Sequence, residues 1–486
     1  MTDAAIPPNA GAPALPPGAG RAAARAVPPP PSRFASYVPP RWFPVAAGAV
    51  GVAAAALLVD NKPGLAVPLV VAAAAAAVLP AVRVRRWDWP LALVGGGLAL
   101  MPALRDAEWL VALDLLAIVA LGCLVVVGVP EFRSVLLAAV SVPARIFPAP
   151  AFLARGLPTS RDFGPWLRGT AIGGALVLVF GALFASADAA FGSLVESALP
   201  DAGLLPARAF MAVFVTLLLA AAVLANRAPV ALPETTPRRL RGAEWLVPLV
   251  ALDLLFAAFV AVQLTVLFGG ADHVLRTAGL TYAEYAVSGF YQLITVCALT
   301  FAVVAGAVRW APAGRPLRGL LGLLLALDAV VLVSALRRLA LYESAYGLSI
   351  QRVLAHTIAL WLGLVLVLVV AAGLTRRSAW LPRAVVGSCA GTLLLLNVLN
   401  PEAMVARDLV DRYERTGKVD EFYLADLSAD AIPQIARLPL PLRTCVLSFT
   451  EIEDDSWAET NRSRARAREV LRDVPPTLYT LPHCAD

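Results

Sequence analysis

The sequence predicts an all-α fold: a polytopic transmembrane helical bundle of about eleven spans, followed by a small helical soluble region. The first observation is composition, because 59% of the 486 residues are hydrophobic, 15% are charged, and the mean hydropathy is +0.75. A water-soluble chain averages roughly 45–50% apolar and about 25% charged residues. The second observation is that the apolar residues form long separate runs, which end near residue 399. The lipid bilayer is therefore the expected partner of most of the chain.

Residues 1–41 are predicted to form a disordered Pro/Ala-rich tail. They contain eleven prolines among many alanines and glycines, without a periodic array of large apolar side chains. Such a composition cannot offset the loss of chain entropy on folding. Because about forty residues precede the first apolar run, we expect that run to be an uncleaved first span and not a signal peptide.

The transmembrane bundle is predicted over residues 42–399. Each apolar run in it is long enough to cross most of a ~30 Å hydrocarbon core at 1.5 Å per residue. The predicted spans are 42–59, 64–82, 87–104, 108–129, 166–186, 204–226, 243–268, 288–308, 317–336, 352–374 and 381–399. Residues 131–150 are also apolar but contain Pro143, Arg145 and Pro148. We expect an interfacial or re-entrant helix there and not a span.

The distribution of Lys and Arg predicts the orientation in the membrane. With the N-terminus in the cytoplasm, the segments on the inner side hold 22 basic residues and the outer loops hold seven. The positive-inside rule therefore favours a cytoplasmic N-terminus. With eleven spans, the C-terminal region lies outside a bacterial cell membrane.

Residues 400–486 are polar and are predicted to be a helical soluble region. The run 401–416 has helical spacing and ends at Gly417, a residue typical of a helix C-terminus. Ser428 is a candidate cap for a second helix, and Asp455 or Ser456 for a third that ends near Arg472. Two cysteines of this region could form a disulfide bond if it faces an oxidising compartment. They are Cys445 and Cys484.

Three aspartates lie inside predicted spans, where a charge costs at least ~2.5 kcal/mol at the bilayer centre. They are Asp114, Asp253 and Asp328. Such carboxyls serve as proton relays, ion ligands or contacts for a polar substrate; the alternative is a structural hydrogen bond between helices. Gln263 is a candidate partner for such a bond.

Internal similarity suggests a parallel repeat. The element Ala-Leu-Asp recurs at each of these three aspartates, and Gly279-Leu280-Thr281 resembles Gly347-Leu348-Ser349. Spans seven and eight would then correspond to spans nine and ten, an arrangement known from transporters. Chance similarity in a chain rich in Ala and Leu is the alternative.

Arginine and tyrosine gather in the predicted loop between spans nine and ten and at the start of span ten. The cluster consists of Arg337, Arg338, Tyr342, Glu343, Tyr346, Arg352 and His356. A basic and aromatic cluster at a membrane surface suits an anionic ligand such as a phosphate head group or a carboxylate. The alternative is that these side chains anchor helix ends and pair with Glu343.

Three stretches carry a resemblance to a known family. They are 259–290 with Gly279-Leu280-Thr281-Tyr282-Ala283-Glu284, 334–352 with Arg337-Arg338 and Tyr346-Gly347-Leu348-Ser349, and 400–431 with Asn400-Pro401-Glu402 and Asp430. With them, residues 245–440 resemble bacterial membrane proteins of domain of unknown function 4173 and its relative 4153. The resemblance implies a multi-pass membrane protein with a family-like core at about 245–399, and it implies no activity.

Several function classes are excluded. The sequence has no GxSxG, HExxH or phosphate-loop motif, and its cysteines and histidines lack zinc-ligand spacing. No cofactor or metal is therefore expected. Basic residues are scattered between apolar runs, which argues against nucleic acid as a partner. The sequence makes no prediction of an oligomeric state.

Three functions remain. The leading hypothesis is transport or sensing of a small or lipidic, anionic ligand from the outer face, without enzymatic activity. In it, Asp253, Asp328 and the arginine–tyrosine cluster bind the ligand or relay protons. The second is a transferase or hydrolase at the outer leaflet that uses Glu284, Glu343 or His356. The third is a scaffold for envelope assembly.

Overall fold

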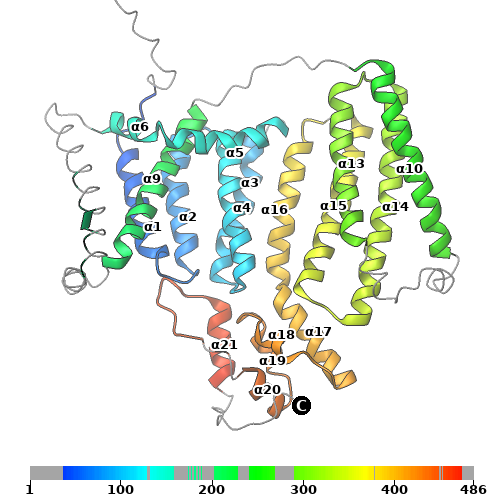
Figure 1. Ribbon diagram of the computed structural model, residues 1–486. Coiled ribbons are helices and arrows are strands. Elements are labelled where there is room, and N and C mark those ends of the chain that lie inside the picture. Colours follow the sequence, from blue (N-terminus) through cyan, green and yellow to red (C-terminus); the bar gives the residue numbers. More distant parts are fainter. Residues whose placement is uncertain are drawn as a thin grey trace, which may run out of the picture.

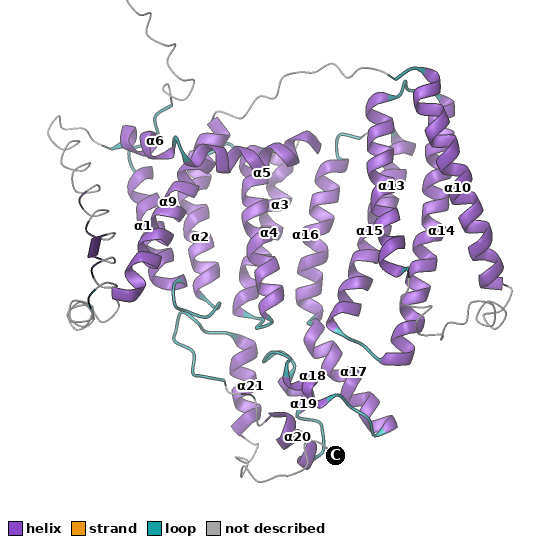
Figure 2. Ribbon diagram, in the orientation of Figure 1, coloured by secondary structure: helices purple, strands orange, loops and turns teal. Residues whose placement is uncertain are grey.

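The computed structural model describes residues 37–128, 132–157, 202–227, 240–268, 289–376, 378–447, 450 and 452–472, with isolated positions between 173 and 188. Every regular element within these residues is a helix (Figure 2), so the all-α prediction is confirmed. The fifth predicted span, at 166–186, lies outside the described residues except for isolated positions.

The helices that cross the bundle form two halves that flank α16 (Figure 1). The N-terminal half contains α1 (Phe43–Leu58), α2 (Ala66–Val78), α3 (Trp89–Leu100), α4 (Glu108–Val127) and α9 (Leu205–Arg227). The C-terminal half contains α10 (Gly242–Phe268), α13 (Phe290–Trp310), α14 (Arg315–Tyr346) and α15 (Ile350–Thr375). Between them, α16 (Leu381–Leu399) contacts α3 on one side and α15 on the other. Each half has a buried apolar core of its own.

Seven of these helices are long and apolar enough to cross a membrane, and the number is eight if one bent helix pair is counted as a span. This makes the chain a multi-pass membrane protein. The predicted count of about eleven is not reached within the described residues, because three predicted spans coincide with short helices. These are α1, α2 and α3, with 16, 13 and 12 residues. At 1.5 Å per residue, 16 residues extend about 24 Å, less than the ~30 Å hydrocarbon core.

The bent pair is the segment expected to be interfacial or re-entrant. It consists of α5 (Phe132–Ile146) and α6 (Ala149–Gly156), whose axes differ by 64°. Both helices lie across one end of the N-terminal half (Figure 1). Pro143 lies inside α5 and removes a backbone donor, and Pro148 directly precedes α6.

Five short helices gather at the opposite end of the bundle (Figure 1). They are α17 (Pro401–Thr416), α18 (Glu421–Ala425), α19 (Ile432–Ile435), α20 (Leu440–Leu447) and α21 (Arg462–Arg472). We call residues 400–472 the C-terminal layer, the bundle end that carries it the layer end, and the other end the far end. Buried residues of α17, α19 and α21 share one apolar cluster with residues of α4, α15 and α16.

The helix ends of the C-terminal layer follow the sequence only in part. As predicted, α17 ends before Gly417, whose φ of 67° suits glycine. Ser428 does not cap a helix, because its hydroxyl accepts from the N–H of Asp430 in a turn. The third predicted helix begins later, at Arg462. There Asn461 Oδ1 accepts from the N–H of Arg464, and Asp455 is used in ion pairs instead.

Candidate functional site

Most of the arginine–tyrosine cluster lies on the last turns of α14. The helix has 32 residues and continues to Tyr346, so Arg337 to Glu343 lie on a helix and not in the loop that was predicted. The connection to α15 is only 347–349, with a φ of 78° at Gly347. At about 48 Å, α14 is longer than a hydrocarbon core of ~30 Å. Its extra turns bring the cluster to α17 of the C-terminal layer.

Arg352 and two tyrosines form the corner between α14 and α15. The guanidinium carbon of Arg352 lies 4.4 Å from the ring centroid of Tyr342 and 5.9 Å from that of Tyr346. The two rings are 4.9 Å apart, and Arg352 Nη1 also donates to the carbonyl oxygen of Gly347. A cation stacked on aromatic faces contributes to holding such a corner in shape. Ser349 caps α15 by accepting from the N–H of Arg352, as predicted.

A potential acid–base pair lies beside this corner. His356 Nε2 is 3.7 Å from Glu343 Oε2, and both side chains are about a third exposed. His356 Nδ1 lies 3.2 Å from the carbonyl oxygen of Arg352, so it is the nitrogen that donates there.

A hollow of about 290 Å³ opens between the end of α14 and α17. Its lining consists of Ala340, Glu343, Ser344, Gly347, Asp408, Arg412 and Arg415. We call it the α14–α17 hollow. Sequence reasoning found Glu343 but missed the three charged residues of α17; a signal was present, because Asp408 and Arg412 are four residues apart in a helix predicted next to the membrane.

Two hydrogen bonds hold the α14–α15 corner against the C-terminal layer. Asp408 Oδ2 accepts from the N–H of Leu348 at 2.9 Å, and the Tyr423 hydroxyl oxygen accepts from the N–H of Ile350 at 3.0 Å. Burial is the main cause that raises the pKa of Tyr423 above its usual value of 10.0. The hollow is therefore lined by the α14–α15 corner and by the C-terminal layer, and these two segments are hydrogen-bonded to each other.

A polar contact inside the C-terminal half connects α10 and α14. Gln263 Oε1 accepts from Ser334 Oγ at 3.1 Å and from Arg338 Nη2 at 3.3 Å. Gln263 thus bonds to the arginine cluster and not to an aspartate. The neighbouring Arg337 is exposed on another face of α14.

Two aspartates of this half are buried among apolar residues. Asp328 is 0% exposed and Asp253 is 4% exposed. No carboxyl oxygen of either residue has a hydrogen bond of normal geometry, although Cys297 and Thr300 of α13 interact with the Asp328 carboxyl. Because α10 and α14 run in the same direction (Figure 1), the bond between Gln263 and Arg338 sets their relative level. Each aspartate lies ten residues before its member of that bond, so the two carboxyls lie at similar depth.

The third intramembrane aspartate has a structural partner. Asp114 is 0% exposed, and its Oδ1 accepts from Asn397 Nδ2 at 2.8 Å. This bond joins α4 to the last turn of α16. The alternative of an interhelical hydrogen bond therefore describes Asp114, whereas it does not describe Asp253.

Asp430 fixes the C-terminal layer to the N-terminal half. The side chain is 1% exposed, and Oδ2 accepts from the N–H groups of Asp106 and Ala107 at 2.7 and 3.1 Å. Oδ1 accepts from Asn400 Nδ2 at 3.2 Å and also from Ser463 Oγ. One carboxylate thus joins the α3–α4 connection, α17 and α21.

Glu402 makes a second connection of this kind. Oε2 accepts from the N–H of Ser428 at 2.6 Å, and Oε1 accepts from Trp109 Nε1 at 3.0 Å. Burial raises the pKa of Glu402 above its usual 4.5, and these hydrogen bonds oppose the rise. Asn400, Glu402, Ser428 and Asp430, which carried part of the family resemblance, therefore hold the C-terminal layer in place.

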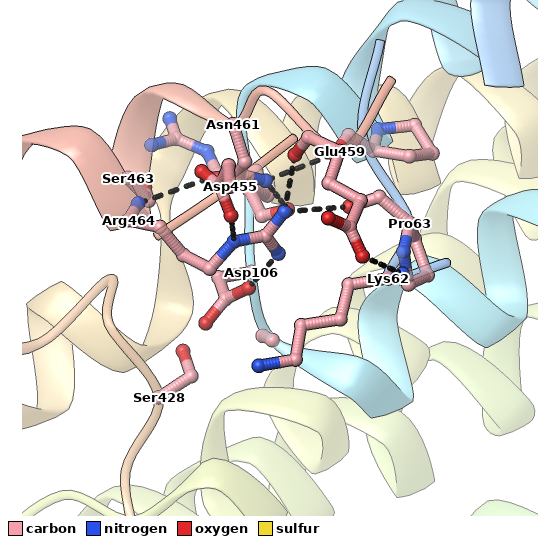
Figure 3. A network of polar contacts seen from close by, with 12 residues as sticks. Lys62, Pro63, Asp106, Ser428, Asp455, Glu459, Asn461, Ser463 and Arg464 are labelled. Atoms are coloured by element: carbon pink, nitrogen blue, oxygen red, sulfur yellow. Dashed lines mark hydrogen bonds and ion pairs between the residues drawn. The ribbon is translucent and has the colours of Figure 1, made fainter. Parts of the chain in front are cut away.

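Figure 3 shows a third connection, centred on Arg464. Its Nη1 donates to Asp106 Oδ1 at 2.6 Å and its Nε to Asp455 Oδ1 at 2.7 Å. Nη2 donates to the carbonyl oxygens of Pro63 and Glu459. The 62–64 loop, the α3–α4 connection and α21 meet at this one side chain. Nothing in the sequence pattern predicted it.

Some predicted residues lie outside the described part of the chain. These are Tyr282, Glu284 and Cys484. Cys445 is buried and disulfide-bonded. Its pairing with Cys484 remains a prediction. Within the described residues, no group of three or more His, Cys, Asp or Glu side chains could hold a metal ion.

Comparison with known proteins finds one family. A family model described as Domain of unknown function (DUF4153) matches residues 92–438. The match begins further towards the N-terminus than the resemblance at 245–440 and includes α4, α9 and most of the C-terminal layer. No curated protein and no solved structure matches.

Proposed function

We propose that this chain, which belongs to the family described as Domain of unknown function (DUF4153), binds a small or lipidic anionic ligand at the α14–α17 hollow and moves it or senses it from that end of the bundle. Asp253 and Asp328 would bind protons in the same process. The observation that carries the proposal is the hollow, because Arg412 and Arg415 lie there at the end of a membrane helix. Arginine binds phosphate and carboxylate groups in a bidentate manner.

Polar groups lead from the hollow into the bundle. Arg338, Ser334 and Gln263 form a contact between α10 and α14, and two buried aspartates, Asp253 and Asp328, follow ten residues deeper. Buried ionisable groups without partners are costly in a membrane, and they mark ion or proton pathways. These groups support a link between ligand binding at the end of α14 and protonation inside the C-terminal half.

Ligand binding can be tested with purified protein and three probes: inorganic phosphate, glycerol phosphate and nanodiscs with phosphatidylglycerol. We expect one probe to bind, and Arg415→Gln or Arg412→Gln to weaken its binding tenfold or more. Arg407→Gln is the matched control, because Arg407 lies on α17, is exposed and does not line the hollow. The soluble probes and the lipid probe distinguish a free ligand from a lipid. Equal binding by all variants would show that the α14–α17 hollow is not the binding site of the probe.

Movement can be tested separately in liposomes loaded with a pH-sensitive dye. If the aspartates couple protonation to transport, Asp328→Asn retains binding of the probe but abolishes its proton-coupled uptake. Uptake that is unchanged in both Asp253→Asn and Asp328→Asn would argue for transport that is not coupled to these two carboxyls, whereas binding without any uptake by the native protein would argue for sensing.

A second candidate is a membrane-embedded transferase or hydrolase that acts on a lipid-linked substrate. It is favoured by the pair of Glu343 and His356, which lies beside the hollow with Nε2 and Oε2 at 3.7 Å. A carboxylate next to an imidazole can activate water or a hydroxyl group. Conversion of a lipid-linked substrate that is lost in Glu343→Gln would support this candidate over transport.

The finer topology is part of the proposal. We place residues 1–41 in the cytoplasm, about eleven spans in residues 42–399 of a bacterial cell membrane, and residues 400–486 outside as a soluble region. The excess of basic residues on the predicted inner side supports this orientation. An impermeant thiol reagent should label Ser456→Cys in intact cells and Arg309→Cys, at the far end, only after lysis. The reverse pattern would invert the orientation.

A further inference from the structure

The layer end of the N-terminal half carries one exposed tryptophan and two exposed arginines within ten positions of the chain. They are Trp457, Arg462 and Arg466, and we call them together the Trp457 face. Trp457 is 63% exposed, and both arginines are exposed. The Trp457 face lies apart from the α14–α17 hollow and does not depend on the function proposed for that site.

Backbone hydrogen bonds fix this segment to the ends of membrane helices. The N–H groups of Leu65 and Ala66 donate to the carbonyl oxygens of Thr460 and Ala458 at 3.1 and 2.8 Å. A Cβ on Gly64 would lie 2.3 Å from the carbonyl oxygen of Glu459, so the two backbones touch. Residues 458–460 therefore lie directly at the start of α2.

The short helices place this segment close to the bilayer. Both α1 and the apolar helix Ala66–Ala81 have 16 residues and extend about 24 Å. A hydrocarbon core of ~30 Å is thicker than that, so the ends of these helices cannot project far into water. A segment bonded to those ends lies at the level of the lipid head groups.

The arginines of α21 divide into two sets. Arg464 and Arg468 face inward and form ion pairs with Asp106, Asp455 and Asp454. In the described part of the chain, no ion pair includes Arg462 or Arg466. The charges of these two side chains are available to an external anion.

We propose that the Trp457 face binds the phosphate groups of anionic phospholipids. A tryptophan beside basic residues at the water–lipid boundary is typical of interfacial anchors. Each arginine near an anionic membrane surface contributes about 1 kcal/mol, and the effect falls off within a Debye length of about 8–10 Å. Arg462 and Arg466 are one turn apart at the start of α21, next to the segment bonded to α2.

The test uses the full chain in nanodiscs with a fluorescent probe on Ser456→Cys. The free cysteines Cys123, Cys297 and Cys389 are replaced beforehand. Brominated lipids quench a probe that lies near the bilayer. We expect brominated phosphatidylglycerol to quench more strongly than brominated phosphatidylcholine at equal mole fraction. Trp457→Ala should weaken the quenching by both lipids.

Charge reversal then identifies the groups that select the lipid. In Arg462→Glu/Arg466→Glu, the local preference for phosphatidylglycerol should fall by roughly 30-fold or more, because the loss of the two arginines alone accounts for about 2 kcal/mol and the new carboxylates add repulsion. Arg472→Glu is the matched control, since Arg472 is exposed at the other end of the same helix, ten residues or about 15 Å beyond Arg462 and six residues or about 9 Å beyond Arg466. It should leave the preference unchanged. Absence of quenching by either lipid, or equal quenching by both in the native protein, would overturn the proposal.

Discussion

Arg464 and Asp106 are 358 positions apart in the sequence and form a 2.6 Å ion pair between Nη1 and Oδ1 (Figure 3). The Arg464 side chain is 6% exposed and that of Asp106 is 21% exposed. A pair of this kind contributes little when both charges are lost together, but removal of one partner leaves the other charge uncompensated. It makes the docking of α21 sensitive to single substitutions.

Arg464→Ala should therefore destabilise the C-terminal layer by about 3–5 kcal/mol, because Asp106 and Asp455 lose their shared cation. Thermal unfolding and the rate of proteolysis within 448–461 measure the effect. Arg437→Ala is the control. Its partners, Asp411 and Glu414, are 40% and 56% exposed, and such surface pairs contribute about 0–1 kcal/mol. Equal proteolysis in both variants would contradict the prediction.

Two glycines of α1 should differ in how well they tolerate substitution by alanine. A Cβ on Gly51 would lie 2.2 Å from Thr216 Oγ1 and 2.4 Å from the carbonyl oxygen of Ala212, whereas a Cβ on Gly48 has no atom within 4 Å. Small residues allow close approach of membrane helices. We expect Gly51→Ala to cost about 1–3 kcal/mol through forced separation of α1 and α9. Gly48→Ala should have no measurable cost in the same unfolding assay.

The buried aspartates should differ in what they contribute to stability. Neither carboxyl oxygen of Asp328 has a hydrogen bond of normal geometry, although Cys297 and Thr300 lie beside it, so Asp328→Val removes a poorly satisfied group and should raise stability by about 1–3 kcal/mol. Asp114→Val should lower stability, because Asn397 Nδ2 loses one of its two acceptors. Thermal unfolding in one detergent compares the two variants. A destabilised Asp328→Val would show that this carboxyl has a structural role.

Glu402 should give the layer a pH dependence of a definite sign. Burial raises its pKa in the folded protein above the usual 4.5, so the folded state binds the proton more tightly than the unfolded state. Stability is then highest below pH 4.5 and falls as the pH rises from there to the raised pKa. The difference in unfolding temperature between the native protein and Glu402→Gln, measured from pH 4 to pH 7, should show this slope. The unfolding temperature of the native protein minus that of Glu402→Gln should fall as the pH rises, and a rise of this value with pH would contradict the prediction.

The apolar spans could be predicted from hydropathy alone, and the seven long helices agree with it. The extra turns of α14 could not, because Arg337 and Arg338 have the composition that normally marks the end of a span. Here they continue a helix whose other face carries Tyr342 and Tyr346. The two arginines end the apolar run, but α14 continues beyond them to Tyr346.

Of the residues at the candidate site, those of α14 and α15 were predicted from the sequence and those of α17 were not. Arg352, Tyr342 and Glu343 are near one another in the sequence, so the sequence alone predicted that they lie close together in space. Asp408 and Arg412 reach the hollow only because α17 folds back onto the α14–α15 corner, through bonds such as that from Leu348 to Asp408. The positions of Asp430 and Arg464 likewise depend on contacts between residues more than three hundred positions apart. Local patterns do not contain such contacts.

The connection of the 62–64 loop to Arg464 also fixes an order of events during biosynthesis. The helices α1 and α2 leave the ribosome first. Arg464, which binds the loop between them, lies on α21, and α21 is translated after every other described helix. The N-terminal helices must therefore insert and remain in the membrane with that loop unsatisfied. A ribosome that stops before Arg464 would release an inserted chain whose N-terminal loops have no partner, a defect that quality-control proteases can recognise.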